Sequence, residues 1–136
     1  GSEKSSLENM VREKNLNNVF FTGFKSNVFD YQSAFDICVY PSENEPFGLV
    51  AVESYSASKP VLVFEDSGGL KEIVSICDPD DIVGSIEEMA KKMDYYYQTK
   101  IDKKNVTKIL SYFSINRMEI DYFQEYKEIL CAELVE

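Results

Sequence analysis

Short apolar runs alternate with amphipathic segments along the first part of the chain. Short runs rich in β-branched and aromatic residues are typical of buried strands, whereas apolar residues three and four positions apart indicate helices. The pattern predicts strands at about residues 18–22, 36–40 and 60–64. It predicts helices at about residues 4–15, 27–34, 48–58 and 69–75. Such alternation indicates parallel βαβ units, so the expected fold class is α/β with a Rossmann-like parallel sheet.

Beyond Pro79 the pattern is entirely helical and predicts a helical C-terminal tail from about residue 79. Asp78 and Ser85 are alternative caps for a helix that runs to about Tyr97. Two further apolar stripes with helical spacing follow, and Ser114 is placed to cap the second of them. Residues 3–136 are therefore expected to form a single domain.

Three strands make a small sheet for a domain of this class. An exposed edge strand offers unpaired backbone groups to other chains. Either the helix expected over residues 4–15 covers this edge, or the edge pairs with a second copy. Self-association through the edge is therefore one expectation.

Composition and charge narrow the class of partner. The chain has 136 residues, of which 44% are apolar and 13% aromatic, so it can bury a core and disorder is excluded. The formal net charge of −10 disfavours nucleic acid as a partner, because phosphate backbones require a basic face. The same charge disfavours contact with anionic membranes through this chain. No run reaches the roughly 20 apolar residues of a membrane-spanning helix.

The cysteines predict neither a disulfide framework nor a metal site. Cys38, Cys77 and Cys131 show no paired spacing, and the odd count without a signal peptide indicates reduced thiols in a cytoplasmic protein. Cys38 lies in an apolar strand and is expected in the core. The chain has no histidine and no CxxC motif, so no metal cofactor is expected.

Candidate chemistry is concentrated after the strand at 36–40. Pro41 ends this strand, a polar turn follows, and Gly48 opens an apolar helix. Glu45 and Glu53 bracket the start of that helix. Either glutamate alone is more often a solvated residue near a helix start. Together, they suit a ligand with hydroxyls for the carboxylates and anionic oxygens for the first helix amides.

Several motifs follow one another in a characteristic order: NVFFTG (18–23), YQSAFDICVYP (31–41), SENEPFGLVAVES (42–54), KPVLV (59–63) and GGLKEIV (68–74). Over roughly residues 7–131 this order resembles the C-terminal, donor-binding half of GT-B retaining glycosyltransferases of family 4. The similarity includes the E-x7-E motif of that family, which matches Glu45 and Glu53.

The resemblance implies a role for each matching residue. In such enzymes the first glutamate of the motif contacts hydroxyls of the transferred sugar, which makes Glu45 the expected catalytic residue, and the second grips the nucleotide ribose, the role of Glu53. No metal is required, and the nucleoside diphosphate sugar is the donor substrate. The remaining expected donor contacts are backbone at Phe47 and Gly48, the diphosphate-facing amides of Leu49 and Val50, and the nucleobase loop at Phe24 and Lys25.

The chain also departs from the pattern of that family. A basic arginine–lysine pair that faces the diphosphate and the N-terminal acceptor-binding domain have no counterpart, and Gly1 and Ser2 look like a vector remnant. The resemblance therefore implies a truncated donor domain of an enzyme that moves a hexose to an acceptor hydroxyl in polysaccharide or glycoconjugate synthesis, with the fragment inactive alone.

Two alternatives belong to other classes. A non-enzymatic α/β interaction module would keep the fold and bind no nucleotide. A receiver-like signalling domain is disfavoured, because the acidic cluster and lysine that phosphoryl acceptance needs are not arranged at strand ends. Gly68 and Gly69 either form a tight turn or allow close backbone approach to the donor or the interdomain cleft.

Overall fold

The computed structural model describes residues 2–99 and 106–133. Its centre is a parallel sheet in the order β1-β2-β3, formed by β1 (Cys38–Tyr40), β2 (Val61–Phe64) and β3 (Ile82–Val83). Cys38 pairs with Val61, and Val63 pairs with Ile82. The first three residues of β2 are fully buried because this central strand is covered on both faces. The prediction of an α/β Rossmann-like parallel sheet is confirmed.

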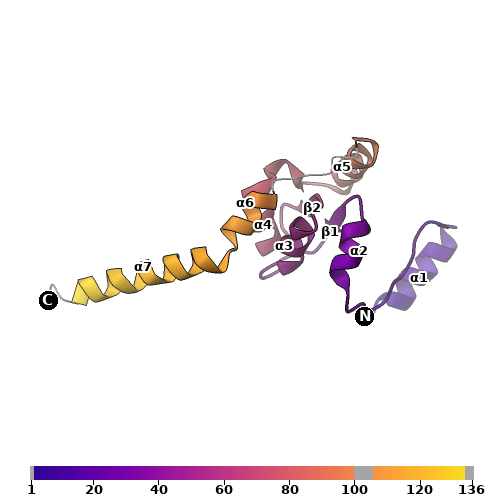
Figure 1. Cartoon of the computed structure of the whole chain (residues 1–136). Coiled ribbons are helices and arrows are strands. Elements are labelled where there is room, and N and C mark those ends of the chain that lie inside the picture. The colour runs from indigo at the N-terminus through magenta and orange to yellow at the C-terminus, as the bar shows by residue number, and fades with distance from the viewer. Residues whose placement is uncertain (1, 100–105, 134–136) are drawn as a thin grey trace.

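Helices form a layer on each face of the sheet (Figure 1). On one face lie α3 (Leu49–Ser56), α4 (Gly69–Cys77) and α6 (Val106–Tyr112). Their apolar side chains join one buried cluster with the strands: Cys38, Ala51, Tyr55, Val61, Val63, Leu70, Ile73, Val74 and Ile109. On the other face α5 (Ile86–Thr99) packs against the sheet through a second cluster, Leu62, Val83, Met89 and Tyr96. The core therefore has the three layers expected of βαβ units.

Two helices lie away from this core. α1 (Lys4–Glu13) has no buried residue and stands apart from the sheet, whereas α7 (Ile115–Glu133) projects from the opposite side (Figure 1). The short α2 (Val28–Ala34) lies between α1 and the core and contacts α3. Within residues 2–99 and 106–133, every helix is too short or too polar to cross a bilayer.

The predicted helix caps are confirmed at two positions. The Ser85 hydroxyl accepts the backbone N–H of Glu88 at 3.2 Å, at the start of α5. The Ser114 hydroxyl accepts the N–H of Arg117 at 3.2 Å, at the start of α7. Asp78, the alternative cap, instead precedes the 3-10 turn η1 (Pro79–Asp81) and makes no side-chain cap there.

The strand predicted at residues 18–22 is wrong. Residues 19–25 have no regular secondary structure, and β1 pairs only with β2 among the described residues. The run has strand propensity, but a strand is stable only when a partner satisfies its backbone groups. Without that pairing the side chain of Phe20 is 81% exposed. In the part of the chain that the structure describes, β1 and β3 each pair only with β2. The predicted edge-mediated self-association stays a prediction.

The tail beyond Pro79 is not entirely helical. β3 (Ile82–Val83) pairs in parallel with the end of β2 and completes the sheet. A two-residue strand carries no periodicity that a sequence pattern can reveal. Its neighbour Asp81 is fully buried, and both of its carboxylate oxygens accept the Tyr96 hydroxyl, at 2.8 and 2.7 Å. This bond fastens α5 to the start of β3.

Candidate functional site

The turn between β1 and α3 ends at a glycine that no other residue could replace without strain. Gly48 has φ of +85°, in the left-handed region that favours glycine. A Cβ at this position would lie 2.9 Å from the side chain of Leu70 on α4. Gly48 therefore lets the turn pass close against α4 and directs the chain into α3.

The first amides of α3 are available to a ligand. The Ala51 N–H donates to the carbonyl of Gly48 at 2.9 Å, which satisfies the third amide of the helix. The N–H groups of Leu49 and Val50 have no acceptor among the described residues. The first amides of a helix point along its axis, and their dipoles favour an anion. The prediction that both amides meet a diphosphate is thus compatible with the local hydrogen bonding.

The two glutamates differ in their surroundings. Glu45 is half-buried in the turn, and Glu53 is exposed in the second turn of α3. The described residues include no ion pair that involves either carboxylate. Phe47, between Glu45 and the helix, is 59% exposed. With respect to the described part of the chain, both carboxylates are therefore unpaired and able to accept hydroxyl hydrogen bonds.

A second loop, between β2 and α4, packs backbone to backbone on the first. The Gly69 N–H donates to the carbonyl of Glu45 at 2.7 Å. A Cβ on Gly68 would lie 2.7 Å from that same oxygen, and a Cβ on Gly69 would lie 2.6 Å from the carbonyl oxygen of Phe47. The two glycines thus give close backbone approach, but the predicted approach to the donor or to the interdomain cleft stays a prediction. The chain segment they approach is the neighbouring turn.

A buried serine reinforces this contact. The Ser67 hydroxyl donates to the carbonyl of Ser42 at 2.7 Å and accepts the N–H of Phe64 at 3.1 Å. In addition, the Asn44 N–H donates to the carbonyl of Asp66 at 2.9 Å. The turn that carries Glu45 is therefore fixed to the sheet by several hydrogen bonds. Sequence reasoning missed Ser67, because a single serine in a loop gives no motif.

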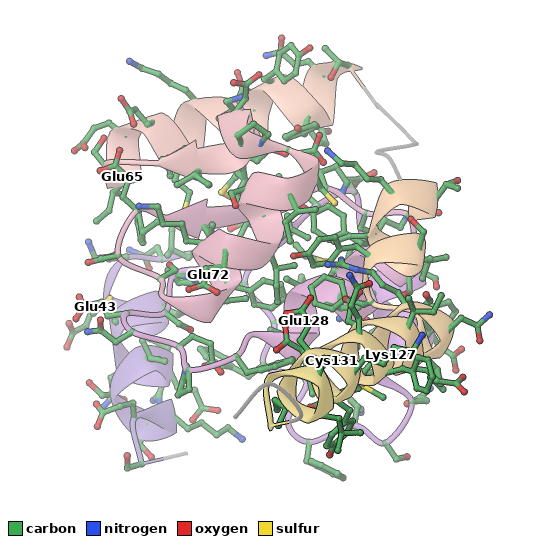
Figure 2. All side chains as sticks on the ribbon, turned by 90° about the vertical axis from the view of Figure 1, so that its left-hand side faces the viewer. Glu43, Glu65, Glu72, Lys127, Glu128 and Cys131 are labelled. Atoms are coloured by element: carbon green, nitrogen blue, oxygen red, sulfur yellow. The ribbon has the colours of Figure 1, made fainter. Side chains whose placement is uncertain are left out.

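A cavity of about 390 Å³ opens at the carboxyl ends of the strands. It is lined by residues that follow β1, β2 and β3, and three of them are acidic: Glu43, Glu65 and Asp66. Figure 2 shows Glu43 and Glu65 along one edge of the molecule. Ligands of open α/β sheets bind at this edge. The carboxylates would repel a diphosphate from this cavity, so the start of α3 is the better anion site.

The acidic cavity does not form a metal centre. Among the residues that the structure describes, no group of three or more histidine, cysteine, aspartate or glutamate side chains has the arrangement to hold a metal ion.

Phe24 and Lys25, predicted near a nucleobase, are displaced from the core. Phe24 is 95% exposed and contacts almost nothing. The Lys25 ammonium lies 5.5 Å from the centre of the Tyr31 ring on α2, a cation–π contact. Their role at a nucleobase stays a prediction.

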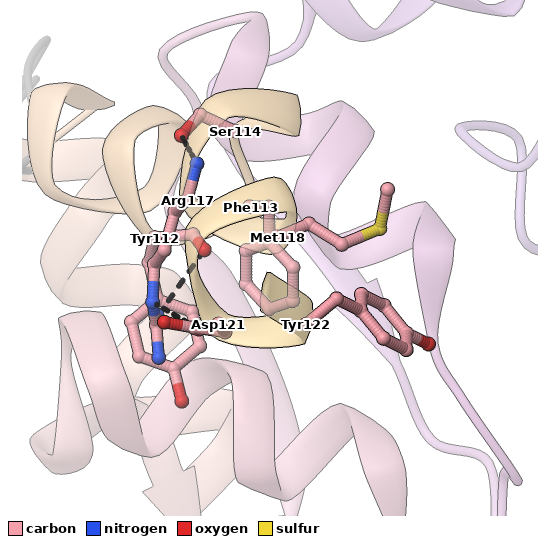
Figure 3. Close-up of a pocket in the computed structure, with 7 residues that line it drawn as sticks. All are labelled: Tyr112, Phe113, Ser114, Arg117, Met118, Asp121 and Tyr122. Atoms are coloured by element: carbon pink, nitrogen blue, oxygen red, sulfur yellow. Dashed lines mark hydrogen bonds and ion pairs between the residues drawn. The ribbon is translucent and has the colours of Figure 1, made fainter. Parts of the chain in front are cut away.

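A pocket at the junction of α6 and α7 is formed by residues that hold the two helices together. Its volume is about 290 Å³. The Arg117 guanidinium lies 3.7 Å from the centre of the Tyr112 ring and forms an ion pair with Asp121, with 3.2 Å between Nε and Oδ2 (Figure 3). It also donates to the carbonyl of Tyr112 at 3.2 Å. With Nε and Nη1 engaged by Asp121 and Tyr112, the arginine holds the bend between the helices.

The three free cysteines lie in different environments. Cys38 is buried in the core, as predicted, and Cys131 is exposed on α7. Burial and then the nearby carboxylate of Asp78 raise the pKa of the Cys77 thiol to about 11. A thiol with a raised pKa is a poor nucleophile at neutral pH.

The comparisons with known proteins all identify glycosyltransferases. Residues 1–109 match the family model described as glycosyl transferases group 1. The chain is 41% identical over 78 residues to an uncharacterized glycosyltransferase of Methanocaldococcus jannaschii. The aligned region covers 54% of this chain and 21% of the relative.

Two more relatives carry similar names. A lipopolysaccharide core biosynthesis glycosyltransferase, LpsD of Rhizobium meliloti, is 36% identical over 69 residues, or 50% of this chain and 20% of the relative. An uncharacterized glycosyltransferase of Haemophilus influenzae is 28% identical over 101 residues, or 69% of this chain and 28% of the relative. The chain thus spans between 20% and 28% of the length of these curated relatives.

Proposed function

The chain belongs to the group 1 glycosyltransferases, and we propose that it forms the donor-binding part of a retaining enzyme of GT-B architecture. The donor is a nucleoside diphosphate sugar, and the enzyme moves its hexose to an acceptor hydroxyl. The product is a polysaccharide or a glycoconjugate. This last point is supported by the similarity to LpsD of Rhizobium meliloti, a lipopolysaccharide core biosynthesis glycosyltransferase.

One observation carries the proposal. Among the described residues, the amides of Leu49 and Val50 lack acceptors, and no ion pair involves Glu45 or Glu53, which flank them in the sequence. Glycosyl transfer releases a diphosphate, on which negative charge develops as the bond to the sugar breaks. Fixed amides at a helix start stabilise that charge with little reorganisation. The proposed reaction therefore needs no metal at this position.

The glutamates take different parts of the donor. Glu45 is half-buried beside the packed loops, which suits close contact with hydroxyls of the transferred sugar. Glu53 lies further along α3 and accepts hydrogen bonds from the ribose. Hydrogen bonds to a charged acceptor are stronger than those between neutral groups, so each carboxylate both binds and orients. The backbone at Phe47 and Gly48 lies against the sugar and the phosphate.

The acceptor is bound outside this chain in the proposed enzyme. Transfer takes place in a cleft between the donor part and an N-terminal acceptor domain, so the chain alone binds the donor and transfers no sugar. Detection of glycosyl transfer by the purified 136-residue chain would contradict this part of the proposal.

Calorimetric titration of the chain with uridine and guanosine diphosphates, and with UDP-glucose and GDP-mannose, tests the donor site. We expect binding of one base type, weakened about tenfold or more in Glu53→Gln because a charged hydrogen bond is lost. Glu45→Gln should weaken the sugar-bearing donor and leave the free diphosphate unchanged. Glu72→Gln, an exposed glutamate on α4, is the matched control and should change neither. Binding of none of these ligands would favour the non-enzymatic α/β module.

A further inference from the structure

Three polar side chains from separate elements meet in the interior beside α3. The Gln32 amide on α2 donates to the Tyr40 hydroxyl at 3.3 Å and to the Ser54 hydroxyl at 3.1 Å. The Tyr40 and Ser54 oxygens are 2.7 Å apart. Gln32 is 3% exposed and Ser54 is fully buried. We refer to Gln32, Tyr40 and Ser54 as the polar triad.

The hydrogen bonds of the polar triad run in one direction. The Ser54 hydroxyl donates its single hydrogen to the carbonyl of Val50 at 2.9 Å. It must therefore accept from both Gln32 and Tyr40. Burial raises the pKa of Tyr40, so the phenol keeps the proton that it donates. The Gln32 side-chain NH2 group donates to two acceptors, and only the amide oxygen is left without a partner. If the amide were flipped, its NH2 group would be buried without acceptors instead.

Two members of the polar triad adjoin the proposed donor contacts. Tyr40 is the last residue of β1 and immediately precedes the turn that carries Glu45. Ser54 follows Glu53 in the same turn of α3 and hydrogen-bonds the carbonyl of Val50, whose own N–H faces the proposed diphosphate site. The bond between Tyr40 and Ser54 therefore links the segment of the first glutamate to the helix of the second.

The third member extends this link to α2. Gln32 lies on the helix that follows residues 24–25, the predicted nucleobase loop. Gln32 and Tyr40 thus lie on elements next to two of the segments with predicted donor contacts, and Ser54 lies within the third. Apolar side chains would pack these elements without the cost of burying polar groups. Directed hydrogen bonds, in contrast, favour one relative placement of the elements.

We propose that Gln32, Tyr40 and Ser54 are positioning residues that fix Glu53 relative to the turn of Glu45 and thereby set ribose recognition. The inference rests on the proposed function and deepens it. The polar triad touches no part of the donor itself. Its effect on binding passes through Glu53, and this distinguishes it from a general contribution to stability.

The test compares two serines of the same helix. Ser54→Ala removes the centre of the polar triad. Ser56→Ala removes a half-buried hydroxyl on α3 that donates to the carbonyl of Val52 at 2.9 Å, the same local bond without the other two partners. The readout is the ratio of dissociation constants for the 2′,3′-dideoxy and ribose forms of uridine or guanosine diphosphate. Both forms share base and phosphates, so a general loss of stability cancels in the ratio.

We expect a ratio of about ten or more in the wild-type chain and in Ser56→Ala, as the loss of a charged hydrogen bond implies. Ser54→Ala should lower it to about three or less. Tyr40→Phe preserves the ring and should act in the same direction, so it replaces Ser54→Ala if that variant does not fold. Glu53→Gln should bring the ratio close to one.

The possible failures are distinguishable. A wild-type ratio retained by the folded Ser54→Ala and Tyr40→Phe variants would overturn this inference and leave the proposed function intact. A ratio that Glu53→Gln does not change would overturn the ribose role of that glutamate. No binding of either diphosphate by the wild-type chain would overturn the proposed function and this inference with it.

Discussion

The backbone N–H of Gly69 donates a 2.7 Å hydrogen bond to the carbonyl of Glu45. This bond joins the loop after β2 to the loop after β1, directly at the glutamate assigned to the sugar. The position of Glu45 therefore depends on a contact with Gly69, a residue remote in the sequence. The backbone conformation of the candidate site depends on both loops together, so a change in either loop is expected to disturb the site.

Gly69→Ala should destabilise the protein and displace Glu45. The added Cβ would lie 2.6 Å from the carbonyl oxygen of Phe47, and backbone cannot rotate away as a flexible side chain can. We expect the free energy of unfolding to fall by about 2 kcal/mol or more, despite the better helix propensity of alanine. Gly84→Ala is the control, because its nearest atoms are 3.6 Å away. Equal urea midpoints for the two variants would contradict the tight contact between the loops.

The layer architecture could be predicted from the sequence because its main elements carry clear periodicity. The runs around β1 and β2 are apolar and short, and the helices after them have apolar stripes. The run at 18–22 has equal strand propensity, yet it pairs with no strand in residues 2–99 and 106–133. Conversely, β3 is formed by Ile82 and Val83, a pair with high strand propensity but too short to show a strand pattern. In both cases pairing with a distant segment decides the outcome, and a local pattern contains no information about that pairing.

The candidate site divides in the same way. The spacing of Glu45, Gly48 and Glu53 around one helix start is local and could be predicted. The contributions of Ser67 and Gln32 could not, because each acts through hydrogen bonds to residues far along the chain. The carboxylate-rich cavity beside β3 was also missed, since it requires the strand that the sequence did not reveal.

Tyr96→Phe should weaken the attachment of α5 to the sheet. The phenol hydroxyl donates to both oxygens of the fully buried Asp81, which also lies 3.5 Å from the Lys92 ammonium. Loss of a hydrogen bond to a buried charged group should lower the free energy of unfolding by about 1–3 kcal/mol. Tyr97→Phe, at a side chain that is 70% exposed, should change it by less than about 0.5 kcal/mol. Chemical denaturation measures the free energy of unfolding of both variants. A loss in Tyr96→Phe as small as that in Tyr97→Phe would show that the buried hydrogen bond is not stabilising.

Cys77 should react slowly with thiol reagents despite its partial exposure. Its pKa is raised from 9.0 to about 11, which lowers the thiolate fraction at pH 8 by about a hundredfold. In the reaction with a thiol reagent, we expect a fast phase that is absent in Cys131→Ser and a slow phase that is absent in Cys77→Ser. The unfolded thiol ionises near pH 9 and the folded one near pH 11, so stability should fall as the pH rises between these values. Comparable rates for both cysteines at pH 8 would contradict the raised pKa.

The amide of Val50 provides a direct test of the anion site. Incorporation of the corresponding α-hydroxy acid at position 50 replaces the N–H by an ester oxygen and leaves the side chain unchanged. This N–H has no acceptor among the described residues, so we expect little change in folding stability. Affinity for the nucleoside diphosphate should fall about tenfold, since a charge-assisted hydrogen bond is lost, whereas affinity for the nucleoside without phosphates should not change.

The same ester at Ala51 is the matched control for this experiment. The Ala51 N–H already donates to the carbonyl of Gly48 at 2.9 Å, so its removal should lower stability by about 1 kcal/mol and leave the phosphate-specific loss small. Opposite patterns at two adjacent positions separate ligand binding from helix stability. If the ester at Val50 lowers stability and spares diphosphate affinity, the start of α3 is an internally satisfied helix end and the diphosphate does not bind there.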